Sequence, residues 1–251
     1  IVYKSLKKLH INAADYFNYS QHYNKHVAYN LAVDKAEDLL SGYFKKYGEF
    51  ILRGRQERSD LELKLLAKEI NNICSLYESH RLYVYQACLN IFHRLHVEKD
   101  EKLEMELEPI EDIINKVQQI FNFYQLDSIY YHLKNVFEFL KLEYYNHYKV
   151  FRKAEEFYDT VNDSTSLLLN NYYLYTFPGQ FLITKIFRNL RMDTMKGMYD
   201  ENEDLFADFE SDPNDVPNHY IYHAYRSLSC YFTAKYDEAA RWINHLLNEV
   251  S

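Results

Sequence analysis

Glycine and proline are scarce in this sequence. Among its 251 residues are 5 Gly and 4 Pro, whereas average usage gives roughly 30 in a chain of this length. β-Sandwiches, barrels and doubly wound α/β folds need turn residues between short strands or at each strand–helix junction. The shortage therefore excludes these classes and favours an all-helical protein.

Cysteine and long apolar runs are scarce as well. Cys74, Cys88 and Cys230 form no CxxC pair and leave an odd number, so we expect buried thiols in a reducing compartment instead of a disulfide framework. The longest uncharged stretch, residues 164–184, is only about half apolar, whereas a membrane-spanning helix needs about 20 mostly apolar residues. These features predict a cytoplasmic protein without a membrane span.

The net charge of −8 comes from two acidic segments. Residues 98–112 contain eight acids and two lysines, and residues 200–215 contain eight acids and no base. Such segments repel phosphate backbones, so we expect no nucleic acid partner for this chain. The second segment also fails as an EF-hand, because Leu205 stands where the calcium loop needs Gly and Ser211 where it needs Glu.

Apolar residues recur at steps of three and four along nearly the whole chain, which predicts helices. The pattern is clear over residues 28–50 and over residues 63–95, and the second stretch either continues unbroken or breaks near Ser79 and His80. Ser59 and Glu62 have the spacing of a capping box, which predicts a helix N-terminus at Ser59.

Other residues predict further helix N-termini. Proline is favoured in the first turn, and Asp or Ser is favoured as the N-cap. The positions expected to begin helices are Pro109, Asp127, Asp163 or Ser164, Pro178 and Pro217.

Three helix–turn–helix joints in the second half of the chain share a pattern. Small residues stand at Ala154, Gly197 and Ala239, which are 43 and 42 positions apart. A period of this size, with one helical hairpin per unit, is typical of stacked α-solenoids. The alternative is that each is simply the small residue found where any two antiparallel helices come close.

The last joint resembles the tetratricopeptide repeat (TPR). The second helix of that repeat has an aromatic residue, then Ala three residues later, then a large residue four further on. This pattern occurs twice, as Tyr236, Ala239 and Ile243 and as Phe151, Ala154 and Tyr158. The resemblance covers roughly residues 128–250. It departs from the family at Glu138 and His223, which replace its Trp, and in its spacing, which exceeds 34 residues.

The predicted fold is therefore all-α, with antiparallel helix hairpins stacked as a divergent TPR-like α-solenoid. We expect a helical region at residues 1–126 and the hairpin repeats at residues 127–251, continuous with the first region. The three joints set the register of the expected repeats.

The resemblance also implies a function. In TPR arrays the first helix of each unit lines a concave groove that binds peptides or partner proteins. The register from the three joints assigns the groove positions to Phe139, Glu143, Asn146, Leu182, Ile186, Asn189, Ala224, Leu228 and Tyr231. Asn146 and Asn189 fall at equivalent positions in this register, where an amide can hold an extended peptide backbone by donating and accepting at once.

Two histidine pairs are the alternative source of chemistry. His22 and His26, and likewise His219 and His223, lie four residues apart, so each pair shares a helix face on which two imidazoles can hold a metal ion. Neither pair has the Glu of HExxH, and 11 His make such spacings frequent.

The sequence contains no phosphate-binding glycine loop and no GxSxG motif. We therefore predict a non-enzymatic scaffold, without metal or cofactor, that binds a protein or peptide in a concave groove. Two alternatives remain open. The chain is the sensor half of a larger regulator, or it is a helical metal-binding enzyme with His219 and His223 as ligands.

Overall fold

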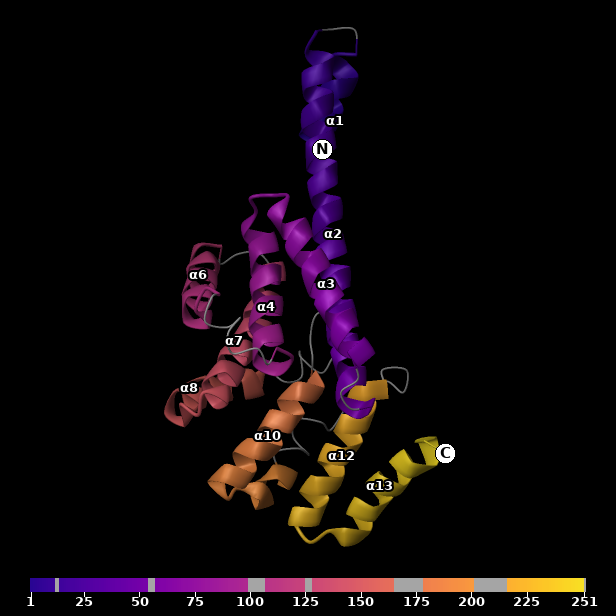
Figure 1. The fold of residues 1–251 in the computed structure, drawn as a ribbon, viewed down its shortest axis with the longest axis vertical. Helices are drawn as coiled ribbons and strands as arrows, with labels where there is room; N and C mark the ends of the chain where they lie inside the picture. Colours follow the sequence, from indigo (N-terminus) through magenta and orange to yellow (C-terminus); the bar gives the residue numbers. More distant parts are fainter. Residues whose placement is uncertain are drawn as a thin grey trace.

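The computed structural model describes residues 1–11, 14–53, 57–98, 107–124, 128–164, 178–200 and 216–250. Every regular element within these ranges is a helix, which confirms the all-α prediction (Figure 1). In chain order they are α1 (Val2–Leu9), α2 (Asp15–Arg53), α3 (Glu57–Ser75), α4 (His80–His96), α6 (Ile110–Phe123), α7 (Ser128–His147), α8 (Phe151–Asp163), α10 (Pro178–Met192), the 3₁₀ turn η1 (Met195–Gly197), α12 (Val216–Phe232) and α13 (Tyr236–Val250). None of the described helices is both long and apolar enough to cross a membrane.

The first helices form an arm that projects from the rest of the molecule (Figure 1). α1 packs antiparallel on the N-terminal half of α2 and has no buried residue. The Tyr3 ring stacks on His22 and His26, with centroids 5.1 and 5.3 Å away. The first of the two predicted histidine pairs therefore packs against an aromatic ring of α1.

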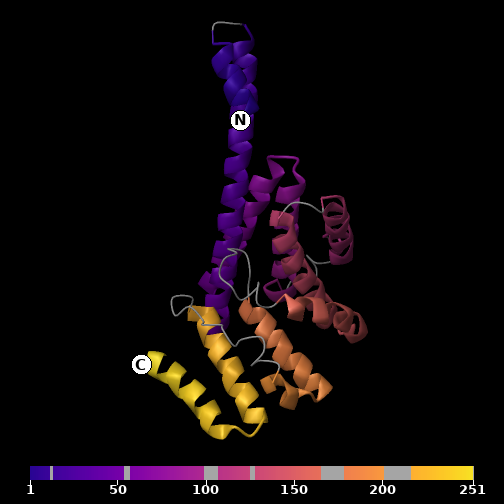
Figure 2. The same ribbon diagram turned by 180° about the vertical axis from the view of Figure 1, so that it is seen from behind.

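The larger core lies below the arm, where α2, α3, α4 and α7 meet. It extends from Val33 to Phe181 and so includes residues on both sides of position 126. Its centre is aromatic: the Phe92 ring of α4 contacts Phe44 and Tyr47 of α2 edge-on, at centroid distances of 5.0 and 4.7 Å. Seen from behind, α6, α7 and α8 lie on the side of α4 that faces away from α2 (Figure 2).

A smaller core joins α10, η1 and α12 at the opposite end from the arm (Figure 2). It contains Leu182, Met195, Met198, Ile221, Tyr222 and Tyr225. α10 is also connected to α8, because Arg188 and Arg191 both pair with the Glu155 carboxylate, at 2.7 and 2.8 Å. The helices from α7 to α13 thus pack on their neighbours in chain order.

Several predicted helix ends are confirmed. α3 ends at Ser75 and Ser79 is the N-cap of α4, where its Oγ accepts a hydrogen bond from the Leu82 amide at 3.4 Å. α10 begins at Pro178 and α12 begins one residue before Pro217. Pro109 is the N-cap of α6 and not its first residue.

The prediction of a capping box at Ser59 is wrong. α3 begins at Glu57, so Ser59 lies inside the helix. Glu62 instead pairs with Arg58 Nε at 3.1 Å and with Lys46 Nζ at 3.6 Å. The carboxylate therefore joins α3 to α2 across the surface instead of capping a helix.

The helix start predicted at Asp163 or Ser164 is also wrong, because α8 ends there: Asp163 is its last residue and Ser164 its C-cap. Asp127 lies outside the described residues. A short polar residue signals a helix boundary in either direction, and the sequence alone did not determine which.

Three helices end in the same kind of turn, and each turn uses a residue other than glycine. Lys149, Asp193 and Ala234 have φ values of 59°, 56° and 62°. In each case the amide of the next residue bonds back across the turn: Val150 to Tyr145, Thr194 to Asn189 and Lys235 to Cys230, at 2.8–2.9 Å. This is the Schellman arrangement, in which Gly normally takes the left-handed position.

The turns also give a register for the hairpins that differs from the predicted one. Ala154 and Ala239 both stand five residues after the left-handed residue, and both are buried. The middle equivalent is Met198, which is fully buried, and not Gly197. The expectation that Gly197 marks a close helix contact is wrong, because no described atom lies within 4 Å of where its Cβ would be.

The left-handed turns lead to a testable expectation. Ala234→Gly should raise the free energy of unfolding by about 0.5–1 kcal/mol, because the left-handed conformation costs a residue with a Cβ about 1–2 kcal/mol and the added chain entropy of Gly offsets part of the gain. The matched control is Ala240→Gly, on the exposed face of α13. It should lower the free energy by about 1 kcal/mol. Urea unfolding curves that move in the same direction for both variants would contradict the assignment.

Candidate functional site

The C-terminal hairpin of α12 and α13 holds the candidate site. The two helices come close where Ser227 Oγ donates a hydrogen bond to the Ala239 carbonyl at 3.0 Å, and Ala239 is buried as the sequence predicted for this joint. The Arg226 guanidinium lies 5.0 Å from the Trp242 ring centroid and adds a second contact between the helices. The hairpin has two exposed sides, and the side chains on them differ in chemistry.

One side is apolar. It comprises five large side chains that are 37% to 62% exposed, and we call them the apolar seam: Leu228, Tyr231, Tyr236, Ile243 and Leu247. The first two are three residues apart on α12, and the other three follow at steps of seven and four on α13, so each set shares a helix face. The Tyr231 and Tyr236 rings are in contact, with centroids 5.7 Å apart, which places the two faces on the same side of the hairpin.

The other side is polar and rich in histidine. His219 and His223 of α12 are buried, and His245 of α13 is exposed. The ring centroid of His223 lies 4.2 Å from that of His219 and 5.0 Å from that of His245. The ligand nitrogens of all three lie within 4.8 Å of one another.

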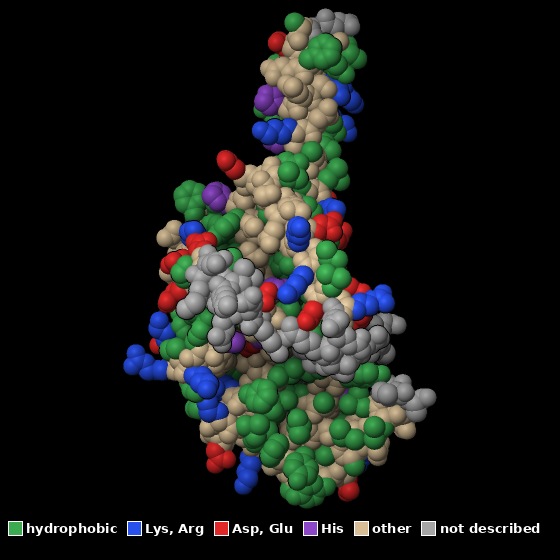
Figure 3. Space-filling view, in the orientation of Figure 1, with side chains coloured by type: hydrophobic (Ala, Val, Ile, Leu, Met, Phe, Trp, Pro, Cys, Tyr) green, Lys and Arg blue, Asp and Glu red, His purple; other side chains and the backbone are tan. Residues whose placement is uncertain are grey.

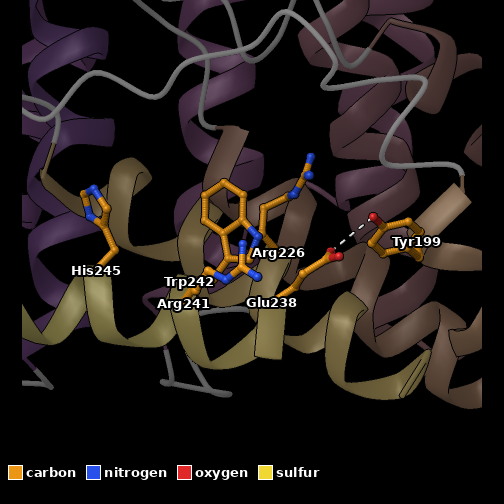
Figure 4. A pocket seen from close by; sticks show the side chains of 6 residues that line it. All are labelled: Tyr199, Arg226, Glu238, Arg241, Trp242 and His245. Atoms are coloured by element: carbon orange, nitrogen blue, oxygen red, sulfur yellow. Dashed lines mark hydrogen bonds between the residues drawn. The ribbon is translucent and has the colours of Figure 1, made fainter. Parts of the chain in front are cut away.

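A pocket of about 390 Å³ adjoins this cluster. It is lined by Tyr199, Arg226, Glu238, Arg241, Trp242 and His245 (Figure 4). Tyr199 donates a hydrogen bond to Glu238 at 3.2 Å, and Lys235 Nζ lies 3.1 Å from the centroid of the Tyr199 ring. These contacts hold the segment that follows η1 against the start of α13.

Four of the nine groove residues predicted from the TPR resemblance are buried in the protein interior. They are Phe139, Glu143, Leu182 and Asn189. The Glu143 carboxylate accepts hydrogen bonds from Gln180 Nε2 at 3.1 Å and from Thr184 Oγ1, and it lies 3.2 Å from His96 Nε2. It therefore joins α7 to α10 and α4.

The two asparagines expected to act as a clamp are not equivalent. Counted from the left-handed residues, Asn189 corresponds to Tyr145, whose carbonyl closes the same turn, and not to Asn146. Both polar atoms of the Asn189 amide are used within the chain: Nδ2 donates to the Lys185 carbonyl at 2.9 Å and Oδ1 accepts from Thr194 Oγ1 at 2.6 Å. The predicted equivalence of Asn146 and Asn189 is therefore wrong by one residue.

The remaining groove candidates lie nearer the surface. Asn146, Ile186 and Ala224 are half-buried, and Leu228 and Tyr231 are exposed. Leu228 and Tyr231 belong to the apolar seam, so the predicted groove and the observed apolar surface coincide only on α12. Binding of a partner there stays a prediction.

All three cysteines are buried and none forms a disulfide, as predicted. Burial raises the pKa of the Cys74 and Cys88 thiols to about 12, and it also raises the pKa of Cys230. The reactive form of cysteine is the thiolate, so at neutral pH these thiols are packing groups and not nucleophiles.

Sequence reasoning identified His219 and His223 but missed His245. A signal was present: in an antiparallel hairpin with Ser227 opposite Ala239, His245 stands opposite residue 221, midway between the two other histidines. Pairing the two helices across their turn would have brought the three together. The second predicted histidine pair is therefore part of a larger cluster, whereas the first packs on Tyr3.

Comparison with models of known protein families, with curated proteins and with solved structures gives no match for this chain.

Proposed function

We propose that the chain is a non-enzymatic helical scaffold that binds a partner protein by docking an amphipathic helix on the apolar seam. The observation that carries the proposal is the alignment of five exposed large apolar side chains along one side of the α12–α13 hairpin. Scattered exposed apolar residues are normal, but a contiguous row of them is typical of an interaction surface.

The surroundings of the seam support this proposal. Figure 3 shows hydrophobic side chains gathered over α10, α12 and α13 on the face turned toward the viewer in Figure 1. Phe187 and Leu190 of α10 are also exposed, and they are three residues apart on one helix face. An apolar surface shared by neighbouring helices favours a protein partner over a small ligand, because it is broad and open.

The dimensions of the seam favour a helical partner. From Tyr236 to Leu247, α13 extends about 16 Å at 1.5 Å per residue, which matches three turns of a docked helix. Helix-in-groove recognition uses apolar anchors at i, i+3, i+4 and i+7 on the incoming helix. Two of the five seam residues are Tyr, which is enriched at interfaces because it buries a large area while its hydroxyl keeps a hydrogen bond.

The scaffold itself is, in our proposal, a divergent TPR-like stack. Three turns of the same geometry occur at Lys149, Asp193 and Ala234, which are 44 and 41 residues apart. Neighbouring helices from α7 to α13 pack in chain order.

The test is site-specific photocrosslinking followed by affinity measurement. A benzophenone amino acid replacing Tyr231 should crosslink one partner, whereas the same probe replacing Phe123, an aromatic residue of α6 that is 81% exposed, should not. With the purified partner, the double variant Tyr231→Asp and Ile243→Asp should bind at least about tenfold more weakly, because each anchor at the centre of an interface contributes about 1–2 kcal/mol or more.

The matched control is Leu61→Asp with Leu65→Asp, which introduces the same charges at two exposed leucines of α3. It should leave the affinity unchanged, and circular dichroism should show both double variants to be folded. Equal affinity of the seam variant and the wild type would overturn the proposal.

A further inference from the structure

The three histidines on the polar side of the hairpin have the geometry of a metal site. A nitrogen ligand binds Zn²⁺ at about 2.0–2.1 Å, so two nitrogens on one tetrahedral ion stand roughly 3.3 Å apart. The nitrogens of His219, His223 and His245 lie within 4.8 Å of one another. Small side-chain rotations, above all of the exposed His245, bring them to the required separation.

Two helices supply the three histidines, and their packing fixes the distance between the rings. His219 and His223 are four residues apart and so project from one face of α12. His245 approaches them from α13, and its ring stacks on that of His223 with an interplanar angle of 27°. The hairpin contact between Ser227 and Ala239 holds the helices at this spacing.

A hydrogen bond sets the tautomer of the central histidine. His223 Nδ1 lies 2.9 Å from the carbonyl oxygen of His219. A carbonyl can only accept, so Nδ1 carries the proton and Nε2 is the nitrogen with a lone pair for a ligand bond. Metal-binding histidines almost always have their other ring nitrogen fixed by a carbonyl or carboxylate in this way.

We propose that His219, His223 and His245 bind one divalent transition-metal ion, with Zn²⁺ as the expected species and a water molecule as the fourth ligand. Imidazole donors suit zinc and its neighbours in the first transition row, whereas Mg²⁺ and Ca²⁺ require oxygen donors. The exposure of His245 leaves room for the water on the solvent side. This proposal is independent of the apolar seam, which lies on the other side of the hairpin.

The metal would link α12 to α13, in addition to the hydrogen bond between Ser227 and Ala239. A ligand that binds the folded state and not the unfolded state raises the melting temperature, by an amount that grows with the ratio of free ligand to its dissociation constant. Zinc binding is therefore expected to stabilise the C-terminal hairpin, and this gives a readout that requires no knowledge of activity.

The test uses the whole chain without a polyhistidine tag, after removal of metals with a chelator. Isothermal titration with ZnCl₂ should give one site per chain with a dissociation constant in the micromolar range or below, and the melting temperature should rise with zinc. Co²⁺ in place of Zn²⁺ should give the intense visible bands of a four-coordinate ion.

The decisive variant is His245→Ala, because the residue is exposed and its removal leaves the buried histidines in place. It should weaken zinc binding by about 100-fold or more, since loss of even an outer-sphere partner costs 10–100-fold. The control is His22→Ala with His26→Ala, which removes the other pair of histidines four residues apart and should leave the affinity unchanged.

The proposal would be overturned by the absence of a one-to-one zinc complex in the wild type, by an unchanged affinity in the His245→Ala variant, or by loss of the site in the His22 and His26 control. A melting temperature that rises equally with zinc in wild type and in His245→Ala would also exclude this site. None of these outcomes bears on partner binding at the apolar seam, which the Tyr231 and Ile243 variant tests separately.

Discussion

Phe92→Ala should lower the free energy of unfolding by about 3–5 kcal/mol, the range measured for large-to-small changes at buried aromatic residues. Phe92 is fully buried at the centre of the larger core. Its ring meets Phe44 and Tyr47 at interplanar angles of 88° and 89°, and such edge-to-face pairs add about 0.5–1.5 kcal/mol each beyond burial. Removing the ring takes away the aromatic contacts of Phe92 between α4 and α2.

The size of the effect depends on whether the core can collapse into the space. Phe92→Leu retains part of the volume and should cost about 1–2 kcal/mol, so the two variants together separate lost burial from lost ring contacts. Phe123→Ala is the control, because Phe123 is 81% exposed. It should change the free energy by less than about 0.5 kcal/mol. Urea unfolding in which Phe92→Ala and Phe123→Ala behave alike would contradict the described core.

Glu143→Ala should lower the free energy of unfolding by about 3 kcal/mol or more, which is typical when one partner of a buried ionic contact is removed. The carboxylate is 5% exposed and receives hydrogen bonds from Gln180 and Thr184 of α10. Its loss leaves two buried donors without an acceptor, and such donors keep their full desolvation cost. The result would show that this residue stabilises the chain, whatever it contributes to a partner.

A double-mutant cycle tests the contact itself. Thr184→Val keeps the shape of the side chain and removes the hydroxyl, and it should cost about 1–2 kcal/mol alone. In the Glu143→Ala background it should cost clearly less, because the two residues share one hydrogen bond. Glu156→Ala on the exposed face of α8 is the surface control and should have little effect. Strictly additive losses in thermal or urea unfolding would contradict the contact.

The helices were predictable because their signals are local. Apolar residues that recur every three or four positions identify a helix from its own sequence alone. Ser79 and Pro178 likewise mark the starts of α4 and α10. The register of the hairpins was not predictable in this way. Lys149, Asp193 and Ala234 share a backbone conformation but no residue type, so no single residue type marks the left-handed position of the turns.

That missing signal explains the error in the middle unit of the predicted groove. Gly197 served as the marker of the middle unit, although Met198 occupies the equivalent position. An error of one residue rotates a helix face by 100°, which is enough to turn a surface position into an internal one. Asn189 is the clearest case, since its side-chain amide bonds to Lys185 and Thr194 within the chain instead of facing a partner. His245 was missed for a related reason: its neighbours belong to another helix.

The projecting arm has a mechanical consequence. α2 is continuous from Asp15 through Val33, its first core residue, to Arg53. Tyr29 is the first residue of α2 that packs against the core, so the 14 residues from Asp15 to Ala28 extend about 21 Å beyond it at 1.5 Å per residue. A continuous helix is stiff, so the arm acts as a lever with its pivot at the edge of the core. A rotation of about 10° at that pivot would move the tip, where Leu9 and Phe17 are exposed, by roughly 4 Å. Repacking of a few side chains near Val33 would thus be amplified into a displacement at the far end of the molecule from the C-terminal hairpin.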